Sequence, residues 1–177
     1  DIRGHGATGR RGDIEFDSQL DDDIQSLVLM MRDEMPKAEV TLAGFSAGGG
    51  LALRFAGGAE GDSIDRLVLI APALDPGAAP MTTARLEAWA TPFVPRLIAI
   101  DLLNRIGVPL FNRLEVIAFA IPAAPTEPPL TARYSYRLMK AMLPDNTGET
   151  LRRVVKPIHL IVGGADELFS PEALRAA

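Results

Sequence analysis

Apolar residues recur at helical spacing near the start of the chain and gather in short segments further along. Residues 18–35 place apolar side chains three and four positions apart, which predicts an amphipathic helix that ends at Pro36. The face that this helix is expected to bury consists of Leu20, Ile24, Leu27, Val28, Met31 and Met35. The segments 39–45, 67–71 and 158–162 are short and mostly apolar, as expected of strands in a parallel sheet.

A second helix is predicted directly after the first of these strands, over residues 47–56, with Gly57 and Gly58 closing it. Alternation of strand, helix and strand implies right-handed crossovers and an α/β fold with a parallel sheet. The glycines at 48–50 lower helix propensity, and close packing of this helix on the sheet would account for them. Residues 67–71 are continuously apolar, so we expect that strand to be covered on both faces.

Residues 77–150 do not continue this alternation of strands and helices. Prolines separate segments with helical patterns and few strand signals, near 82–90, 96–106, 109–120 and 131–143. One apolar stripe in this region consists of Leu97, Ile98, Leu102, Leu103 and Ile106. An all-helical insertion between two sheet strands is interpreted as a cap over the carboxyl edge of the sheet.

This pattern predicts three stretches of chain. They are 1–76, the first part of a core domain, 77–150, the helical cap or lid, and 151–177, the last part of the core.

The composition is that of an ordinary globular protein and argues against several kinds of function. The 177 residues suffice for a domain with a hydrophobic core, and 47% of them are hydrophobic. A net charge of −5 without a cluster of Lys and Arg gives no reason to expect nucleic acid. The absence of cysteine excludes disulfides and a cysteine nucleophile, and two histidines do not suggest a multi-histidine metal site. No motif suggests a cofactor.

Charged residues also bear on membranes and metals. The most apolar run, 97–122, contains Asp101, Arg105, Arg113 and Glu115, which argue against a transmembrane segment. Asp21, Asp22 and Asp23 open the first helix, and we interpret them as partners of the helix dipole on a solvated face rather than as metal ligands. We expect a cytoplasmic location, and the oligomeric state is left open.

The segment Gly44-Phe45-Ser46-Ala47-Gly48 carries the clearest chemical signal. A serine with glycine two residues away on each side, at a turn from strand to helix, is the nucleophile-elbow pattern. The turn should hold the serine in a strained backbone conformation, and a Cβ at either glycine should collide with neighbouring backbone. Ser46 is then the candidate nucleophile and the Ala47 N–H a candidate oxyanion donor. The alternative is a glycine-rich helix start beside a buried serine.

A serine hydroxyl needs a base, and that base needs an orienting group. Asp166 follows Gly163-Gly164-Ala165, just beyond the carboxyl end of the last predicted strand, where catalytic loops of a parallel sheet gather. It is therefore the candidate acid of a catalytic triad. The alternative role for Asp166 is that of a turn or helix-capping residue.

Three blocks of sequence resemble the α/β-hydrolase superfamily, and within it the group of lysophospholipases, monoacylglycerol lipases and serine aminopeptidases. Residues 1–6, Asp-Ile-Arg-Gly-His-Gly, are similar to a turn motif of that group, residues 44–49 to its elbow, and residues 163–171 to its acid loop. The resemblance covers 1–75 and 156–175 well. It implies an α/β-hydrolase fold with a helical cap, with Ser46 as nucleophile, Asp166 as acid and the Ala47 N–H as one oxyanion donor.

The chain also departs from that group. The family order is serine, acid, histidine, and no histidine follows Asp166. We expect His159 to be a core histidine of its strand and His5 to brace the turn motif, with a base role as the lesser alternative for His5. The first strands and the loop with the second oxyanion donor are also missing from the pattern. We therefore expect an internal fragment, incomplete at both ends and inactive by itself, with the catalytic histidine beyond residue 177.

The resemblance implies a serine hydrolase that forms an acyl-enzyme on Ser46 with a small carboxylic ester, and the apolar stripes suggest a lipophilic, lipid-like acyl group. Two alternatives stay open at this stage. One is a non-catalytic α/β-hydrolase-like binding protein, and the other is an acyltransferase that uses the same acyl-enzyme.

Overall fold

The computed structural model describes residues 1–75, 89–121, 130–166, 168, 171 and 174. The chain forms two compact units. Unit 1 consists of Asp1–Gln19 and Thr83–Ala141, and unit 2 of Leu20–Thr82 and Met142–Ala177. The domain limits drawn from the sequence pattern stay a prediction.

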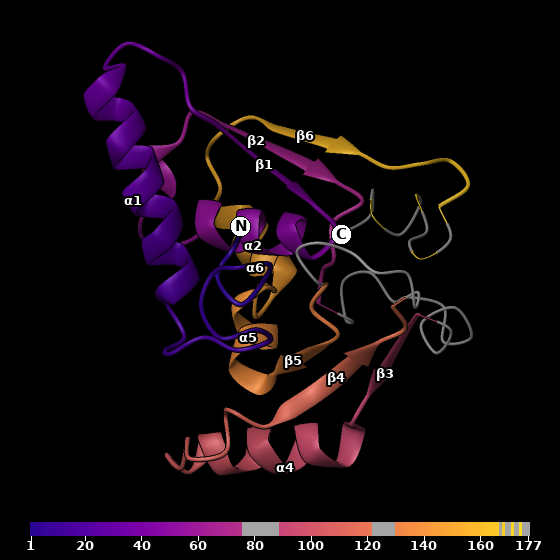
Figure 1. Cartoon of the computed structure of the whole chain (residues 1–177). Helices are drawn as coiled ribbons and strands as arrows, with labels where there is room; N and C mark the ends of the chain where they lie inside the picture. The colour runs from indigo at the N-terminus through magenta and orange to yellow at the C-terminus, as the bar shows by residue number, and fades with distance from the viewer. Residues whose placement is uncertain (76–88, 122–129, 167, 169–170, 172–173, 175–177) are drawn as a thin grey trace. The chain divides into compact units, whose positions relative to one another are not determined.

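Unit 2 is built on a parallel sheet of three strands in the order β1-β2-β6 (Figure 1). The strands are β1 (Thr41–Phe45), β2 (Arg66–Ile70) and β6 (Ile158–Ile161), close to the predicted segments. Pairing of Phe45 with Ile70, and of Ile70 with Ile161, brings the three carboxyl ends to one level. The helices are α1 (Gln19–Glu34), α2 (Ala47–Ala56), the 3₁₀ turn η1 (Gly61–Ser63) and α6 (Thr147–Arg153). The predicted α/β architecture with a parallel sheet is confirmed.

The core of unit 2 lies between the sheet and α2. Leu53 and Phe55 of α2 pack with Leu67 and Leu69 of β2, and all four side chains are buried. On β2 the residues between them are less covered, because Val68 is half-buried and the terminal residues of the strand are exposed. The expectation that this strand is covered on both faces is therefore wrong. Its buried face is the one that meets α2.

The expectation that His159 is a core histidine is also wrong. Strand β6 pairs with β2 alone within the described part of the chain, and it forms one edge of that sheet. His159, Leu160 and Ile161 are exposed there.

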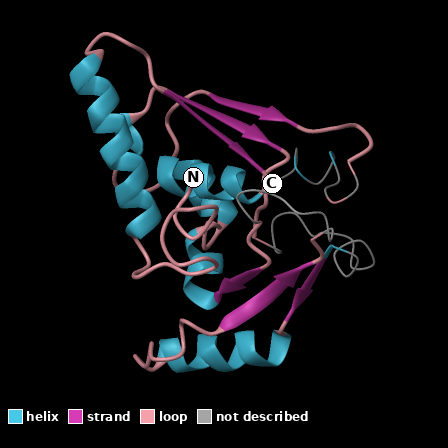
Figure 2. Ribbon diagram, viewed as in Figure 1, coloured by secondary structure: helices cyan, strands magenta, loops and turns pink. Residues whose placement is uncertain are grey.

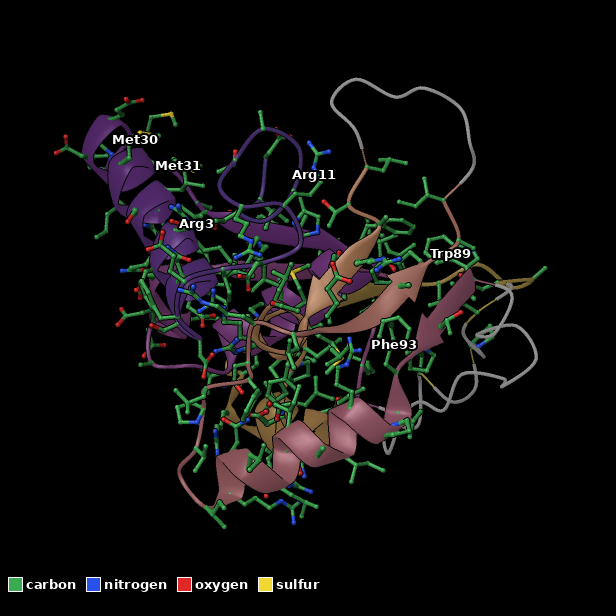
Figure 3. All side chains as sticks on the ribbon, turned by 60° about the horizontal axis from the view of Figure 1, so that its bottom comes forward. Arg3, Arg11, Met30, Met31, Trp89 and Phe93 are labelled. Carbon is green, nitrogen blue, oxygen red and sulfur yellow. The ribbon has the colours of Figure 1, made fainter. Side chains whose placement is uncertain are left out.

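Helix α1 follows its predicted boundaries but buries only part of its predicted face. Leu20 and Val28 are buried, whereas Leu27, Met31 and Met35 are exposed. Met30 and Met31 project from the end of α1 in Figure 3. The acidic start of α1 differs from the expectation too. Asp21 is half-buried and forms an ion pair of 2.9 Å with Arg54 of α2, so it is not a solvated partner of the helix dipole alone.

Unit 1 contains an antiparallel sheet in the order β3-β4-β5, which Figure 2 shows in magenta. Its strands are β3 (Ala90–Pro92), β4 (Glu115–Phe119) and β5 (Arg133–Ser135), and its helices are α4 (Val94–Arg105) and α5 (Tyr136–Ala141). The expectation of an all-helical insertion is therefore wrong. Gly107, with φ of +78°, follows the end of α4, and Val116 and Ile117 then favour an extended strand with partners on both sides.

The helical segments expected in this region agree with the structure only in part. The segment 96–106 corresponds to α4, whereas 109–120 holds turns and β4, and 131–143 begins as strand β5 before α5. Most of the segment 82–90 falls outside the described residues. The stripe predicted on α4 is not its buried face: Ile98, Leu102 and Ile106 are exposed, while Ile100 packs with Val116 and Tyr136.

In the described part of the chain, none of the helices combines the length and the apolar character that crossing a membrane requires.

Candidate active site

Ser46 stands at the turn between β1 and α2 in unit 2. Its backbone has φ of 52° and ψ of −120°, a conformation that L-residues other than glycine rarely adopt. Such a conformation costs on the order of 1–3 kcal/mol and persists only when surrounding contacts hold it. Here the Ser46 N–H donates to the carbonyl of Ile70 at 3.0 Å, and the Ser46 carbonyl accepts from the N–H of Ala73 at 2.8 Å. The predicted strain at this serine is thus present.

The Ser46 side chain is not used to cap the helix. Although Ser46 is the N-cap residue of α2, its hydroxyl makes no capping hydrogen bond. Serine at an N-cap commonly accepts a hydrogen bond from the first turn of the helix. The residue is half-buried rather than buried in the core, and its hydroxyl makes no hydrogen bond to the helix end. The alternative of a buried serine at a helix start is disfavoured by this geometry.

The two glycines of the elbow motif have different roles. A Cβ on Gly44 would lie 2.1 Å from the carbonyl oxygen of Gly48, which is backbone and cannot swing away. A Cβ on Gly48 would meet nothing within 4 Å. The expectation that both positions need glycine for steric reasons is therefore right for Gly44 and wrong for Gly48, because Gly48 faces open space at the start of α2.

The next two glycines explain the glycine-rich sequence instead. A Cβ on Gly49 would lie 2.8 Å from Cβ of Pro72, and one on Gly50 would lie 2.5 Å from the carbonyl oxygen of Ala73. The absence of a Cβ at both positions lets α2 approach the segment that follows β2. Close packing therefore accounts for the low helix propensity of this turn, as expected.

Ala47 is the first residue of α2 and is half-buried. The first N–H groups of a helix have no partner within it, and the helix dipole places partial positive charge there. The Ala47 N–H therefore keeps the features of the predicted oxyanion donor.

Asp166 lies on the loop after β6, at the same edge of the sheet as Ser46. Its N–H donates to the Gly163 carbonyl at 3.2 Å, and its Oδ1 accepts from the Leu168 N–H at 2.9 Å. Leu168 packs against a small buried cluster that includes Ala71, the residue directly after β2. The loop is thus held near the carboxyl end of the strand that pairs with β1. The Leu168 hydrogen bond is the turn role that the sequence left open, and a bond to one carboxylate oxygen is compatible with an orienting role as well.

Neither histidine of the chain has the position of a triad base after Asp166. His159 is exposed within β6. His5 belongs to unit 1, where its Nδ1 lies 3.3 Å from the Arg3 carbonyl and its Nε2 2.6 Å from the Tyr134 hydroxyl. Because a carbonyl only accepts, Nδ1 carries the proton and the Tyr134 hydroxyl donates to Nε2. These contacts are those of a residue that braces its loop.

Burial tunes the pKa values of this pair. Desolvation lowers the pKa of His5, against an opposing effect of hydrogen bonding to the backbone of Arg3 and Ile2, so the neutral ring is favoured. Burial raises the pKa of Tyr134 to about 12, which keeps the phenol protonated. The rings of His5 and Tyr134 meet edge to face at 5.2 Å, and Phe119 meets Tyr134 at 4.7 Å. Sequence reasoning missed Tyr134, since nothing in its pattern marks a partner 129 residues from His5.

A second strained residue was also missed. Ala71 has φ of 41°, is buried, and directly follows β2, the neighbour of the elbow strand. Its N–H donates to the Ile161 carbonyl at 2.8 Å, so the hydrogen bonds of the sheet continue through it. Alanine gives no sequence signal of such a conformation. Among the described residues, no group of three or more His, Asp or Glu side chains could hold a metal ion.

Comparison with solved structures shows the fold. The E-2-(acetamidomethylene)succinate hydrolase structure aligns with 99% of this chain at a TM-score of 0.54 and 19% identity. The N-formylmaleamic acid deformylase Nfo from Pseudomonas putida S16 aligns with 99% at a TM-score of 0.55 and 17% identity. The chain spans 65% and 66% of the lengths of these two proteins. With the parallel sheet and its serine turn, this similarity defines the fold as that of the α/β-hydrolases.

The family is defined by a sequence model. The Hydrolase_4 model, described as serine aminopeptidase, S33, matches residues 1–177. The chain belongs to this family of serine hydrolases. No curated protein sequence matches it.

Proposed function

We propose that this chain provides the nucleophile and the acid of a serine hydrolase that cleaves carboxylic esters, with a lipophilic acyl group as the favoured substrate. The observation that carries the proposal is Ser46, a non-glycine residue with positive φ whose hydroxyl does not cap the helix that begins beside it. Strained backbone of this kind persists where the surrounding structure enforces it, and it occurs preferentially at functional sites.

The proposed reaction follows from the placement of these groups. Ser46 Oγ attacks the substrate carbonyl, and the negative charge that develops on the carbonyl oxygen is stabilised by the Ala47 N–H at the positive end of α2. The alcohol leaves, an acyl-enzyme forms on Ser46, and water releases the acid. Asp166 orients the histidine that accepts and returns the proton. We propose that this histidine lies outside residues 1–177, which makes the 177-residue chain inactive by itself.

The two similar structures bear on the type of bond that the protein cleaves. Their names describe enzymes acting on acetamidomethylene succinate and on an N-formyl amide acid. A small amide is therefore the second substrate class to test beside esters.

The test is turnover of a series of 4-nitrophenyl acyl esters and of a small N-acyl amide by a protein that also supplies the histidine. Replacing Ser46 by alanine should lower kcat/KM by roughly 10⁴-fold or more. The matched control is Ser26→Ala, because the Ser26 hydroxyl is exposed and bonds only within α1, to the Asp22 carbonyl. Retained hydrolysis in Ser46→Ala would contradict the proposal. If an added alcohol accepts the acyl group and a new ester forms in place of the acid, the protein is an acyltransferase instead.

A further inference from the structure

A small cavity in unit 1 is lined by an unusual set of charges. Its volume is about 150 Å³, and the charged residues around it are Arg3, Arg10, Arg113, Arg137, Asp13 and Glu15. Four guanidinium groups thus face two carboxylates, whereas the whole chain carries a net charge of −5. The local charge has the opposite sign to that of the chain.

One of the arginines is already neutralised. The guanidinium of Arg137 binds both carboxylate oxygens of Asp13, from Nε to Oδ1 and from Nη2 to Oδ2, each at 2.8 Å. The side chains are 10% and 6% exposed, so this fork is buried. Desolvation raises the pKa of Asp13, but the hydrogen bonds and charge of Arg137 and a bond from Ser135 hold it below the ordinary value.

Two further arginines of the lining, Arg10 and Arg113, keep long side chains at the surface. Arg10 reaches Asp13 only at 3.8 Å and its side chain is 74% exposed, and Arg113 is exposed. Long, exposed guanidinium side chains can reorient to present a planar pair of N–H donors.

We propose that this cavity binds a small oxyanion, a carboxylate or a phosphate group, through Arg10 and Arg113. Guanidinium groups bind both kinds of group through two parallel hydrogen bonds. A cavity volume of about 150 Å³ leaves room for a small anion. A bound anion offsets the repulsion between the two exposed guanidinium groups, and the buried ion pair with Asp13 holds Arg137 in place.

This inference is independent of the chemistry at Ser46, because every residue used here belongs to unit 1. An inactive Ser46 variant should therefore bind the anion as well as the parent protein. Failure of the proposed hydrolysis and failure of anion binding are separate results.

The test is calorimetric titration of the purified protein with inorganic phosphate and, separately, with succinate. We expect saturable binding of at least one anion with Kd of about 1 mM or tighter. The double variant Arg10→Gln, Arg113→Gln should weaken binding by about tenfold or more. Arg152→Gln, a change of an exposed arginine on α6 of unit 2, is the matched control and should leave Kd unchanged.

The two titrations also distinguish the sources of the anion. Binding of phosphate alone assigns a phosphorylated ligand, and binding of succinate, with or without phosphate, assigns a carboxylate. A circular dichroism spectrum checks that the double variant stays folded, and Arg113→Lys, which keeps the charge but loses the planar fork, serves as a second variant with weakened binding. Absence of saturable binding for both anions, or an unchanged Kd in the double variant, would overturn the proposal.

Discussion

The two glycines of the elbow motif can be separated by substitution. In Gly44→Ala the new Cβ would lie 2.1 Å from the Gly48 carbonyl oxygen and 2.7 Å from the Gly49 Cα. Both atoms belong to the backbone of the first turn of α2, so the turn itself has to move by about 1 Å to restore an ordinary contact. In Gly48→Ala the new Cβ meets nothing within 4 Å.

The magnitudes follow from these contacts. Overpacking against backbone costs about 1–3 kcal/mol or more, and the reduced entropy of the unfolded chain returns about 0.4–1 kcal/mol. We therefore expect Gly44→Ala to lower the free energy of unfolding by about 1–2 kcal/mol or more. Gly48→Ala should be neutral or stabilising by up to about 1 kcal/mol, because alanine has the higher helix propensity.

The assay is urea unfolding followed by circular dichroism at equal protein concentration. The difference between the variants is a large share of a typical stability of about 5–15 kcal/mol, so the midpoints should separate clearly. Equal midpoints for the two variants, or Gly48→Ala as the less stable one, would refute the steric account of the elbow.

Three further predictions follow from the same contacts. Because burial lowers the pKa of His5 below 6.5, its contribution to stability is present above pH 6.5 and is lost as the pH falls through the folded pKa. Melting curves from pH 7.5 to about 5.5 should show this loss, and an equal loss in His5→Gln would contradict the assignment to His5. Asp13→Asn should destabilise the protein by about 3 kcal/mol in urea unfolding, since it leaves the buried Arg137 uncompensated, and wild-type stability would contradict the buried pair. Asp166→Asn should fold normally but lose roughly 10³- to 10⁴-fold in kcat, and an unchanged rate would assign the acid to another residue.

The regular parts of unit 2 could be predicted from the sequence because local pattern and packing agree there. The strand predicted over 39–45 is observed as β1 (Thr41–Phe45), and the helix predicted over 47–56 as α2 (Ala47–Ala56). Glycine at 44, 49 and 50 permits the close approach that the turn between them requires. Ser46 and Asp166 could be proposed because both follow predicted strands whose carboxyl ends meet at one edge of the sheet.

The rest depended on contacts between residues far apart in the sequence. Strand β4 falls in the segment 109–120, for which the sequence predicts a helix between prolines, and its pairing with β3 and β5 decides the outcome instead. His159 looked like a core residue because its strand is apolar, but the coverage of an edge strand is set by its neighbours. The Asp13–Arg137 fork and the His5–Tyr134 bond join positions more than a hundred residues apart, which no local pattern can show.

The central claim is that Ser46 is an activated nucleophile, and covalent labelling tests it directly. A protein that contains this chain and the proposed histidine is treated with a fluorophosphonate probe, and the adduct is located by peptide mass spectrometry. We predict a single adduct on Ser46 that is absent from Ser46→Ala and present in Ser26→Ala. An adduct on another serine, or undiminished labelling of Ser46→Ala, would contradict the account.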